Sequence, residues 1–189
     1  VATVCYLIGV SGIPIYAFLL VQGALNTSSM KRYVLTVLIF AVVSEVPYDL
    51  AVSGKPFNME DQNVMFTVLI ALIMLWLLKV FEGKGAGPKL MCFLIVAGGC
   101  FWAIVLNCKF GGAFVLITAI LFLLRERKGW SILLALIVSL IYATALFGFA
   151  PAALYSGERK NIEKKSTKYF YYAFYPVMLG IFAVIVAVL

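Results

Sequence analysis

Long apolar runs separated by short charged connections constrain this chain more than any other feature. The runs from Val1 to about Leu25, from Asn63 to Phe81 and from Trp130 to about Leu154 each approach or exceed the roughly 20 residues that a helix needs to cross a bilayer. Hydrocarbon offers backbone N–H and C=O groups no water, so runs of this kind fold as helices that satisfy their own hydrogen bonds. The pattern predicts an all-α integral membrane protein, a polytopic helical bundle.

Composition supports a membrane location. Hydrophobic residues make up 65% of the 189-residue chain, charged residues only 12%, and the mean hydropathy is +1.09. Such a chain has too little polar surface to cover a water-soluble globule. No linker-like or low-complexity tract interrupts the pattern, so we expect residues 1–189 to form a single transmembrane domain within the lipid bilayer.

The remaining runs leave the number of membrane crossings open between six and seven. Runs from Tyr33 to Ser44, from Leu90 to Leu106 and from Tyr169 to Leu189 predict three further helices, the first of them continuing beyond Ser44. The run from Ala113 to Leu124 is short, and it predicts either a short span or a re-entrant segment. Glycine and proline in the stretch from Glu82 to Lys89 predict a flexible turn.

The positively charged residues do not orient the predicted bundle. With seven crossings, eight bases fall on one side of the membrane: Lys31, Arg32, Lys79, Lys84, Lys89, Arg125, Arg127 and Lys128. Seven fall on the other: Lys55, Lys109, Arg159, Lys160, Lys164, Lys165 and Lys168. With so even a split, the positive-inside rule favours neither orientation. A re-entrant Ala113 segment changes it to ten against five, which favours six crossings.

The net charge of +7 raises the question of nucleic acid binding. The bases lie in connections between apolar runs, and no aromatic-basic RNA-binding motif accompanies them, so we predict contacts with lipid headgroups and no nucleic acid partner. The chain has no histidine, the commonest metal ligand, and its four cysteines lack paired metal-ligand spacing. We therefore predict no metal site.

Acidic residues gather in the stretch from Lys31 to Thr67. It holds four of the eight acids of the chain: Glu45, Asp49, Glu60 and Asp61. If Pro47 only kinks its helix, Glu45 and Asp49 lie on one face, four residues apart, at the end of an apolar run. A carboxylate at a membrane edge is a candidate general base. The alternative is a helix-end carboxylate that is solvated or paired with Lys55.

Three further polar residues are candidates for substrate or cofactor contacts, and each has a structural alternative. Asn63 and Thr67, one turn apart at the start of a span, suit either substrate binding or the capping and bridging of helices. Lys109 lies in a glycine-bearing break between two runs. It suits either a phosphate or carboxylate ligand, or a side chain that reaches back to the membrane interface.

Several motifs in order along the chain support a family comparison. The segments are IPIYAFLLVQG (13–23), Arg32-Tyr33 followed by LIFAVVSEVPYDLA (38–51), QNVMFT (62–67), KYFY (168–171) and FYP (174–176). Together they resemble the TraX family of bacterial membrane proteins, and the resemblance extends over nearly the whole chain.

The resemblance implies a multi-pass protein of the bacterial cytoplasmic (inner) membrane. The best-known member of the family acetylates the amino-terminal residue of conjugative pilin, so acetyl-coenzyme A is the expected donor and a pilin or other peptide the expected acceptor. Such a transfer needs a base for the amine and a donor group or cation for the oxyanion. Under this hypothesis Glu45 or Asp49 is the base. Arg159, which matches a family arginine, holds an anionic group such as a coenzyme phosphate, or else belongs to a solvated or lipid-contacting loop.

The chain departs from the family pattern at its acid and histidine positions. Gln22, Asn26 and Met178 occupy positions where the family has an acid and two histidines, and Lys109 replaces the acid of a DYG motif. Many members also carry an aspartate–histidine pair in a helix ahead of the segment that starts here at Val1. Because each general acid or base contributes about 10²–10⁴-fold, these replacements predict weakened catalysis.

The resemblance and the departures from it leave the enzyme question open between three functions. The first is a TraX-like membrane-bound N-acetyltransferase that works without histidine. The second is a non-catalytic homologue that binds a peptide or a partner membrane protein. The third is a small-solute transporter with its path near the break at Asn107 to Gly112, since discontinuous helices often line such paths.

Overall fold

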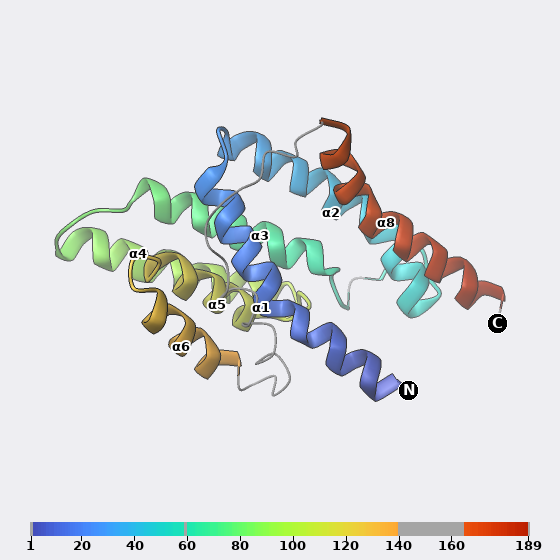
Figure 1. The fold of residues 1–189 in the computed structure, drawn as a ribbon. Helices are drawn as coiled ribbons and strands as arrows, with labels where there is room; N and C mark the ends of the chain where they lie inside the picture. Colours follow the sequence, from blue (N-terminus) through green and yellow to red (C-terminus); the bar gives the residue numbers. More distant parts are fainter. Residues whose placement is uncertain (1, 59, 140–164, 189) are drawn as a thin grey trace.

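The computed structural model describes residues 2–58, 60–139 and 165–188, with side chains from residue 9 onward and, in the last segment, from residue 173. Over these residues it is a bundle of seven helices without a strand, which confirms the all-α prediction (Figure 1). The helices are α1 (Ala2–Asn26), α2 (Met30–Ser53), α3 (Val64–Val80), α4 (Ala86–Val105), α5 (Gly111–Leu123), α6 (Lys128–Ser139) and α8 (Lys165–Val188).

The surface of the bundle is that of a membrane protein. Three stretches are long and apolar enough to cross a bilayer, Gly9–Asn26 in α1 and the whole of α2 and α4. Only 6% of α4 is buried within the protein, and large apolar side chains such as Phe93 and Trp102 are more than half exposed. A water-soluble protein rarely exposes so much contiguous apolar surface, whereas lipid tails cover it at no cost.

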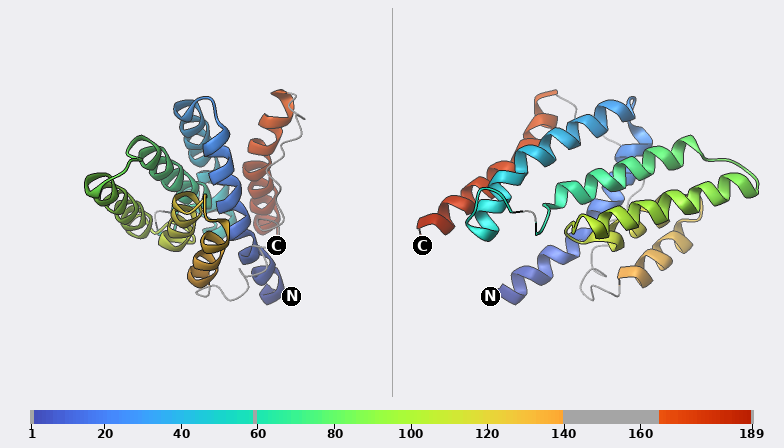
Figure 2. Two further views of the ribbon diagram at one scale, coloured as in Figure 1. Left: turned by 60° about the vertical axis from the view of Figure 1, so that its left-hand side comes forward. Right: turned by 180° about the vertical axis from the view of Figure 1, so that it is seen from behind.

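Helix α5 lies at the centre of the bundle and packs against α1, α3, α4 and α6 (Figure 2). It is apolar on all sides, and the side chains of Phe114, Ile117 and Phe122 are almost completely buried, as expected for a helix with protein on every face. Sequence periodicity does not reveal this central place, because α5 has no polar face.

The two ends of α5 lie beside the two ends of α3. Just before α5 begins, the backbone oxygen of Lys109 accepts a hydrogen bond of 2.6 Å from the Thr67 hydroxyl in the first turn of α3. Just after α5 ends, Arg125 forms an ion pair with Glu82, which follows α3. Although 13 residues span only ~20 Å, α5 runs from one end of α3 to the other. This favours the short span over the re-entrant segment.

Small residues let α4 approach its neighbours closely. A Cβ atom added at Gly99 would lie 3.1 Å from Val115 Cγ1 in α5 and 3.5 Å from Met74 Cβ in α3. Ala103, one turn later, is fully buried. This small-xxx-small spacing is typical of membrane helix interfaces, where van der Waals packing replaces the hydrophobic effect.

Helix α8 packs along α2 and runs parallel to it (Figures 1 and 2). An apolar groove of about 530 Å³ separates their carboxyl-terminal halves, with Val46, Leu50 and Gly54 on one side and Gly180 and Ala187 among the residues on the other. The start of α8 therefore lies toward the start of α2. Seven alternating spans would make α8 antiparallel to α2 and would place Lys165 and Lys168 at the same end as Lys55 and Lys109. That placement is wrong, because α8 runs parallel to α2.

Several predicted boundaries need correction. Helix α4 begins at Ala86, within the predicted turn, because the first helical turn tolerates Pro88, whose missing N–H would have no partner there. Helix α8 begins at Lys165, four residues before the predicted start. The run predicted to continue to Leu154 is described only as far as Ser139.

Candidate functional site

Two connections far apart in the sequence meet at one end of the bundle. Residues 54–63 join α2 to α3, and residues 106–110 join α4 to α5. Gln62 lies between them in a short parallel bridge: its backbone N–H donates to the Asn107 oxygen (3.3 Å), and its oxygen accepts from the Lys109 N–H (3.4 Å). The hydrogen bond from Thr67 to the Lys109 oxygen adds a third link. The connections therefore hold each other in place.

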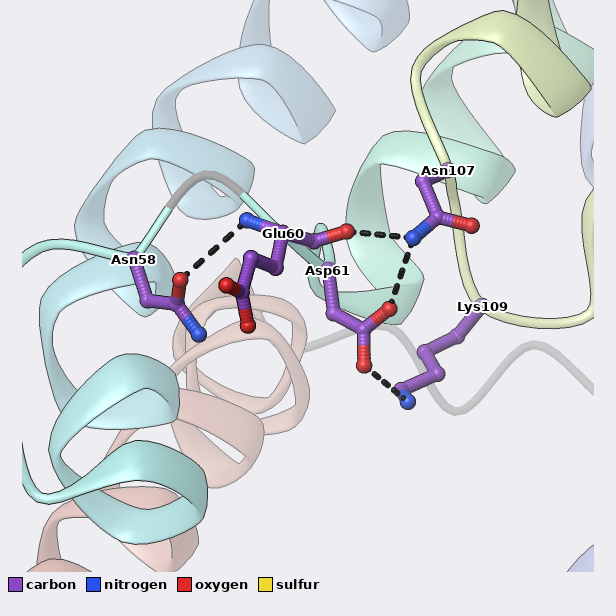
Figure 3. Close-up of polar contacts among 5 residues, drawn as sticks. All are labelled: Asn58, Glu60, Asp61, Asn107 and Lys109. Atoms are coloured by element: carbon purple, nitrogen blue, oxygen red, sulfur yellow. Dashed lines mark hydrogen bonds and ion pairs between the residues drawn. The ribbon is translucent and has the colours of Figure 1, made fainter.

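Side chains extend this contact into a polar network (Figure 3). The Asn107 amide donates to the backbone oxygen of Glu60 and to Asp61 Oδ1, the latter at 2.9 Å. Lys109 Nζ lies 2.8 Å from Asp61 Oδ2 and forms an ion pair with it. On the other side, Asn58 Oδ1 accepts from the Glu60 backbone N–H at 3.2 Å. We call this network, together with the neighbouring polar side chains of α2 and of the start of α3, the polar junction. Its members are Glu45, Tyr48, Asp49, Asn58, Glu60, Asp61, Asn63, Thr67, Asn107 and Lys109.

The α4–α5 connection has an unusual backbone. Asn107 and Phe110 have positive φ values of 48° and 61°, a conformation that residues other than glycine seldom adopt. For a bulky residue such as Phe110 it costs about 1–3 kcal/mol and persists only where surrounding contacts impose it. The bonds from Gln62 and Thr67 supply those contacts. Strained turns of this kind are common at functional sites.

Asn63 ties Glu45 to the start of α3. Its side-chain oxygen caps α3 by accepting from the Met65 N–H (2.8 Å), and its amide donates to the Ala41 backbone oxygen (3.0 Å) and to Glu45 Oε2. Asn63 is completely buried, whereas Glu45 is half-buried. The carboxylate of Glu45 is thus held in one orientation while part of it stays accessible.

Helix α2 continues unbroken through Pro47, as predicted, so Asp49 lies on the same face as Glu45. Its environment is nevertheless different. It is only 2% exposed, and its Oδ2 accepts a hydrogen bond of 2.9 Å from the Asn58 backbone N–H. The carboxylate therefore stabilises the α2–α3 connection, and Lys55 is not its partner. Of the two acids, Glu45 is the one that a substrate can reach.

Lys109 provides the positive charge of the polar junction. The hydrogen bond from its ammonium to Asp61 raises the pKa of Lys109 above its ordinary value, so it is charged at neutral pH. The hydroxyl of Tyr48 lies beside this ammonium, but the pair does not have the geometry of a hydrogen bond. Within the described residues, the buried hydroxyls of Tyr48 and Ser44 have no hydrogen-bond partner. A buried hydroxyl without a partner is rare, and it leaves Tyr48 with a free donor beside a cation.

Cys108 and Tyr175 complete the surroundings. Burial raises the pKa of the Cys108 thiol, so at neutral pH it is not the thiolate that nucleophilic catalysis requires. Tyr175, part of the aromatic series predicted to form a membrane belt, extends from α8 toward Tyr48 and the Val64 backbone N–H at the start of α3. Among the described residues no group of histidine, cysteine and acidic side chains could hold a metal ion.

Of the six residues proposed from the sequence, the structure brings five together: Glu45, Asp49, Asn63, Thr67 and Lys109. Arg159 lies outside the described residues.

Sequence reasoning overlooked five members of the polar junction as site residues: Tyr48, Asn58, Glu60, Asp61 and Asn107. Their partners are up to 48 positions away, and no local spacing signals such pairings. Only the unusual concentration of acids between α2 and α3 pointed to this end of the bundle.

Comparisons with known proteins identify the family. The family model described as TraX protein matches residues 1–186 of the 189. No curated protein and no solved structure matches the chain. Because the family model covers almost all of the sequence, including every element that builds the polar junction, the chain belongs to the TraX family.

Proposed function

We propose that this protein transfers an acetyl group from acetyl-coenzyme A to the amino terminus of a peptide, a pilin subunit in the family's best-known case, and that the transfer takes place at the polar junction in the bacterial inner membrane. Membership of the TraX family supports the reaction class. The observation that carries the proposal is the half-buried carboxylate of Glu45, oriented by the completely buried amide of Asn63. An acid held in this way inside a membrane helix suits a general base.

The chemistry assigns a role to several groups of the polar junction. As the amine attacks the thioester carbonyl, a nitrogen–carbon bond forms, and Glu45 accepts the proton that the nitrogen loses. The carbon–sulfur bond then breaks, and the sulfur leaves as a thiol after taking up that proton. Lys109 and the free hydroxyl of Tyr48 are the cation and the donor that stabilise the oxyanion. Asn63 orients the base and is a positioning residue.

The fixed orientation of Glu45 compensates in part for the absence of histidine. A carboxylate is a weaker base than imidazole toward an ammonium group, but one that a neighbouring amide holds in place is aligned for proton transfer. Glu45 has a single side-chain donor, Asn63, in the described part of the protein. We still expect a slow enzyme, because the family's acid and histidine positions are replaced by Gln22, Asn26 and Met178.

A non-catalytic membrane homologue that binds a peptide or a partner protein is the second candidate. One observation favours it: the side chains of Asp49, Asn63 and Thr67 are all engaged in bonds that hold the connections of the bundle. The solute-carrier alternative lacks such support. The break on which it rested is a short turn between two neighbouring helices, held by Gln62 and Thr67.

Transfer in proteoliposomes tests the proposal. Purified protein is reconstituted and given acetyl-labelled coenzyme A and a peptide with a free amino terminus, and incorporation of label into the peptide is followed by mass spectrometry. Losing the general base predicts a rate at least ~10²-fold lower for Glu45→Gln. Glu126→Gln is the matched control, because Glu126 is exposed at the opposite end of the bundle.

Two outcomes decide between the candidates. Equal rates for Glu45→Gln and the parent protein would exclude Glu45 as the base. If the parent neither acetylates the peptide nor binds the coenzyme, yet retains the peptide, the enzyme proposal fails and the binding homologue replaces it. A peptide acetylated in advance at its amino terminus serves as the negative substrate.

A further inference from the structure

The helix ends of the bundle form two sets that differ sharply in charge. At one end lie the α1–α2, α3–α4 and α5–α6 connections. Lys79 near the end of α3 donates to the Ala24 oxygen near the end of α1 (3.1 Å), and Arg125 after α5 pairs with Glu82 after α3. These bonds show that the three connections lie side by side. The polar junction occupies the opposite end of α3 and α5.

Positive charge concentrates at the first of these ends, which we call the basic end. It carries eight bases, Lys31, Arg32, Lys79, Lys84, Lys89, Arg125, Arg127 and Lys128, and its acids in the described residues are Glu82 and Glu126. The polar-junction end has two bases, Lys55 and Lys109, and four acids, Glu45, Asp49, Glu60 and Asp61. Lys109 is paired with Asp61.

Helix α8 adds to this asymmetry. Because α8 runs parallel to α2, the turn that carries Lys165 and Lys168 lies toward the basic end. The sequence alone placed these two lysines on the opposite side and so reached an even split. With α8 reversed, the described part of the chain has ten bases toward one end and two at the other, and the positive-inside rule now favours one orientation.

We propose that the basic end is a docking surface for the anionic phospholipid headgroups of the cytoplasmic leaflet, and that the polar junction consequently faces the outer side of the membrane. Lysine and arginine near a membrane surface are attracted to anionic lipids and are retained on the cytoplasmic side. The acids at the other end experience no such attraction. The charge distribution therefore fixes the orientation of the site.

The orientation has a consequence for the two substrates. An acceptor peptide reaches the polar junction from outside the cytoplasm, whereas a phosphorylated donor made in the cytoplasm first meets the basic end. The orientation itself rests on charge and helix direction alone. It goes beyond the proposed acyl transfer and stands or falls independently of it.

Cysteine accessibility tests the orientation in the full-length protein. Lys55→Cys places a thiol in the exposed connection after α2, and Gly87→Cys places one in the first turn of α4, where an added Cβ meets no atom within 4 Å. Spheroplasts are treated with a membrane-impermeant maleimide before and after permeabilisation. The parent protein measures labelling of its own cysteines, of which Cys108 is buried and Cys92 and Cys100 are half-buried.

We expect Lys55→Cys to react in intact spheroplasts and Gly87→Cys to react only after permeabilisation. The reverse pattern, or equal labelling of both variants from outside, would overturn the proposal. Transfer activity is assayed on the same preparations, so a failed orientation and a failed enzyme give different results.

A second variant tests the role of the charges. Neutralising Lys84 and Lys89 together with Lys31 and Arg32, each to Gln, in the Lys55→Cys background removes half of the eight bases at the basic end. We expect this change to reduce the fraction of molecules labelled from outside. An unchanged fraction would show that the basic end does not set the orientation.

Discussion

The hydrogen bond between Asn63 and Glu45 is the contact on which the candidate site depends, and its strength can be measured by a double-mutant cycle. The cycle consists of Asn63→Ala, Glu45→Ala and the double variant. Asn63→Ala removes the α3 cap, the bond to the Ala41 oxygen and the bond to Glu45, but the first two are lost in both Glu45 backgrounds and cancel in the cycle. The coupling energy therefore reports the bond alone.

The structure sets the expected size. A hydrogen bond to a charged group contributes about 1.5–3 kcal/mol, and we take the lower value, ~1.5 kcal/mol, because Glu45 is only half-buried. The cap adds about 1 kcal/mol and the bond to the Ala41 oxygen about 0.5–1.5 kcal/mol, so Asn63→Ala costs about 3–4 kcal/mol in all. In a chain of 189 residues each kcal/mol lowers Tm by about 2–4 °C. The single variant should lose roughly 6–16 °C, of which the bond to Glu45 accounts for about 3–6 °C.

Thermal unfolding in detergent, followed by circular dichroism, measures all four proteins. Asn63→Ser is the matched variant, because serine keeps the cap and lacks the amide; it should lose only the parts assigned to Glu45 and to the Ala41 oxygen. A coupling energy below ~0.5 kcal/mol, which is the limit of additivity for independent sites, would refute the claim that Asn63 orients Glu45.

Three further predictions concern the contacts that hold the polar junction and the bundle. Thr67→Val leaves the Lys109 oxygen without its donor and should cost about 1–3 kcal/mol, whereas Thr118→Val, also fully buried but bonded within its own helix, should cost much less in the same unfolding assay. Gly99→Ala places a Cβ 3.1 Å from a side chain of α5 and should destabilise the protein by about 1–3 kcal/mol. The neighbouring variant Gly98→Ala is the control, because its Cβ meets nothing within 4 Å, and it should be neutral or stabilising. Similar Tm values for the two variants would contradict the close packing of α4. Because the pKa of Lys109 is raised, its ion pair with Asp61 contributes fully at neutral pH and is lost as the pH rises through and beyond 10.5. The Tm difference between the parent and Lys109→Met is small, worth at most about 1 kcal/mol. It should shrink in that alkaline range and not at acidic pH above 5.

The helices themselves were predictable. Long apolar runs have one stable conformation in lipid, the helix, so α1, α3 and α4 appear within about four residues of their predicted bounds. Glu45 and Asp49 share a face because Pro47 does not interrupt α2. Asn63, at the first polar position before an apolar run, caps α3 as its residue type favours. Each of these features depends on residues within one or two helical turns.

The arrangement of the helices was not predictable in the same way. Nothing local indicates that α5 lies at the centre or that α8 runs parallel to α2, because an apolar helix can bury any face and run in either direction. The pairing of Asp61 with Lys109 and of Gln62 with Asn107 depends on two connections meeting across more than forty residues. Local chemistry determined that the chain forms membrane helices with acids at one helix end. Tertiary packing alone decided which polar groups meet there and that the start of α8, with Lys165 and Lys168, lies toward the opposite end, because contacts between distant segments fix both.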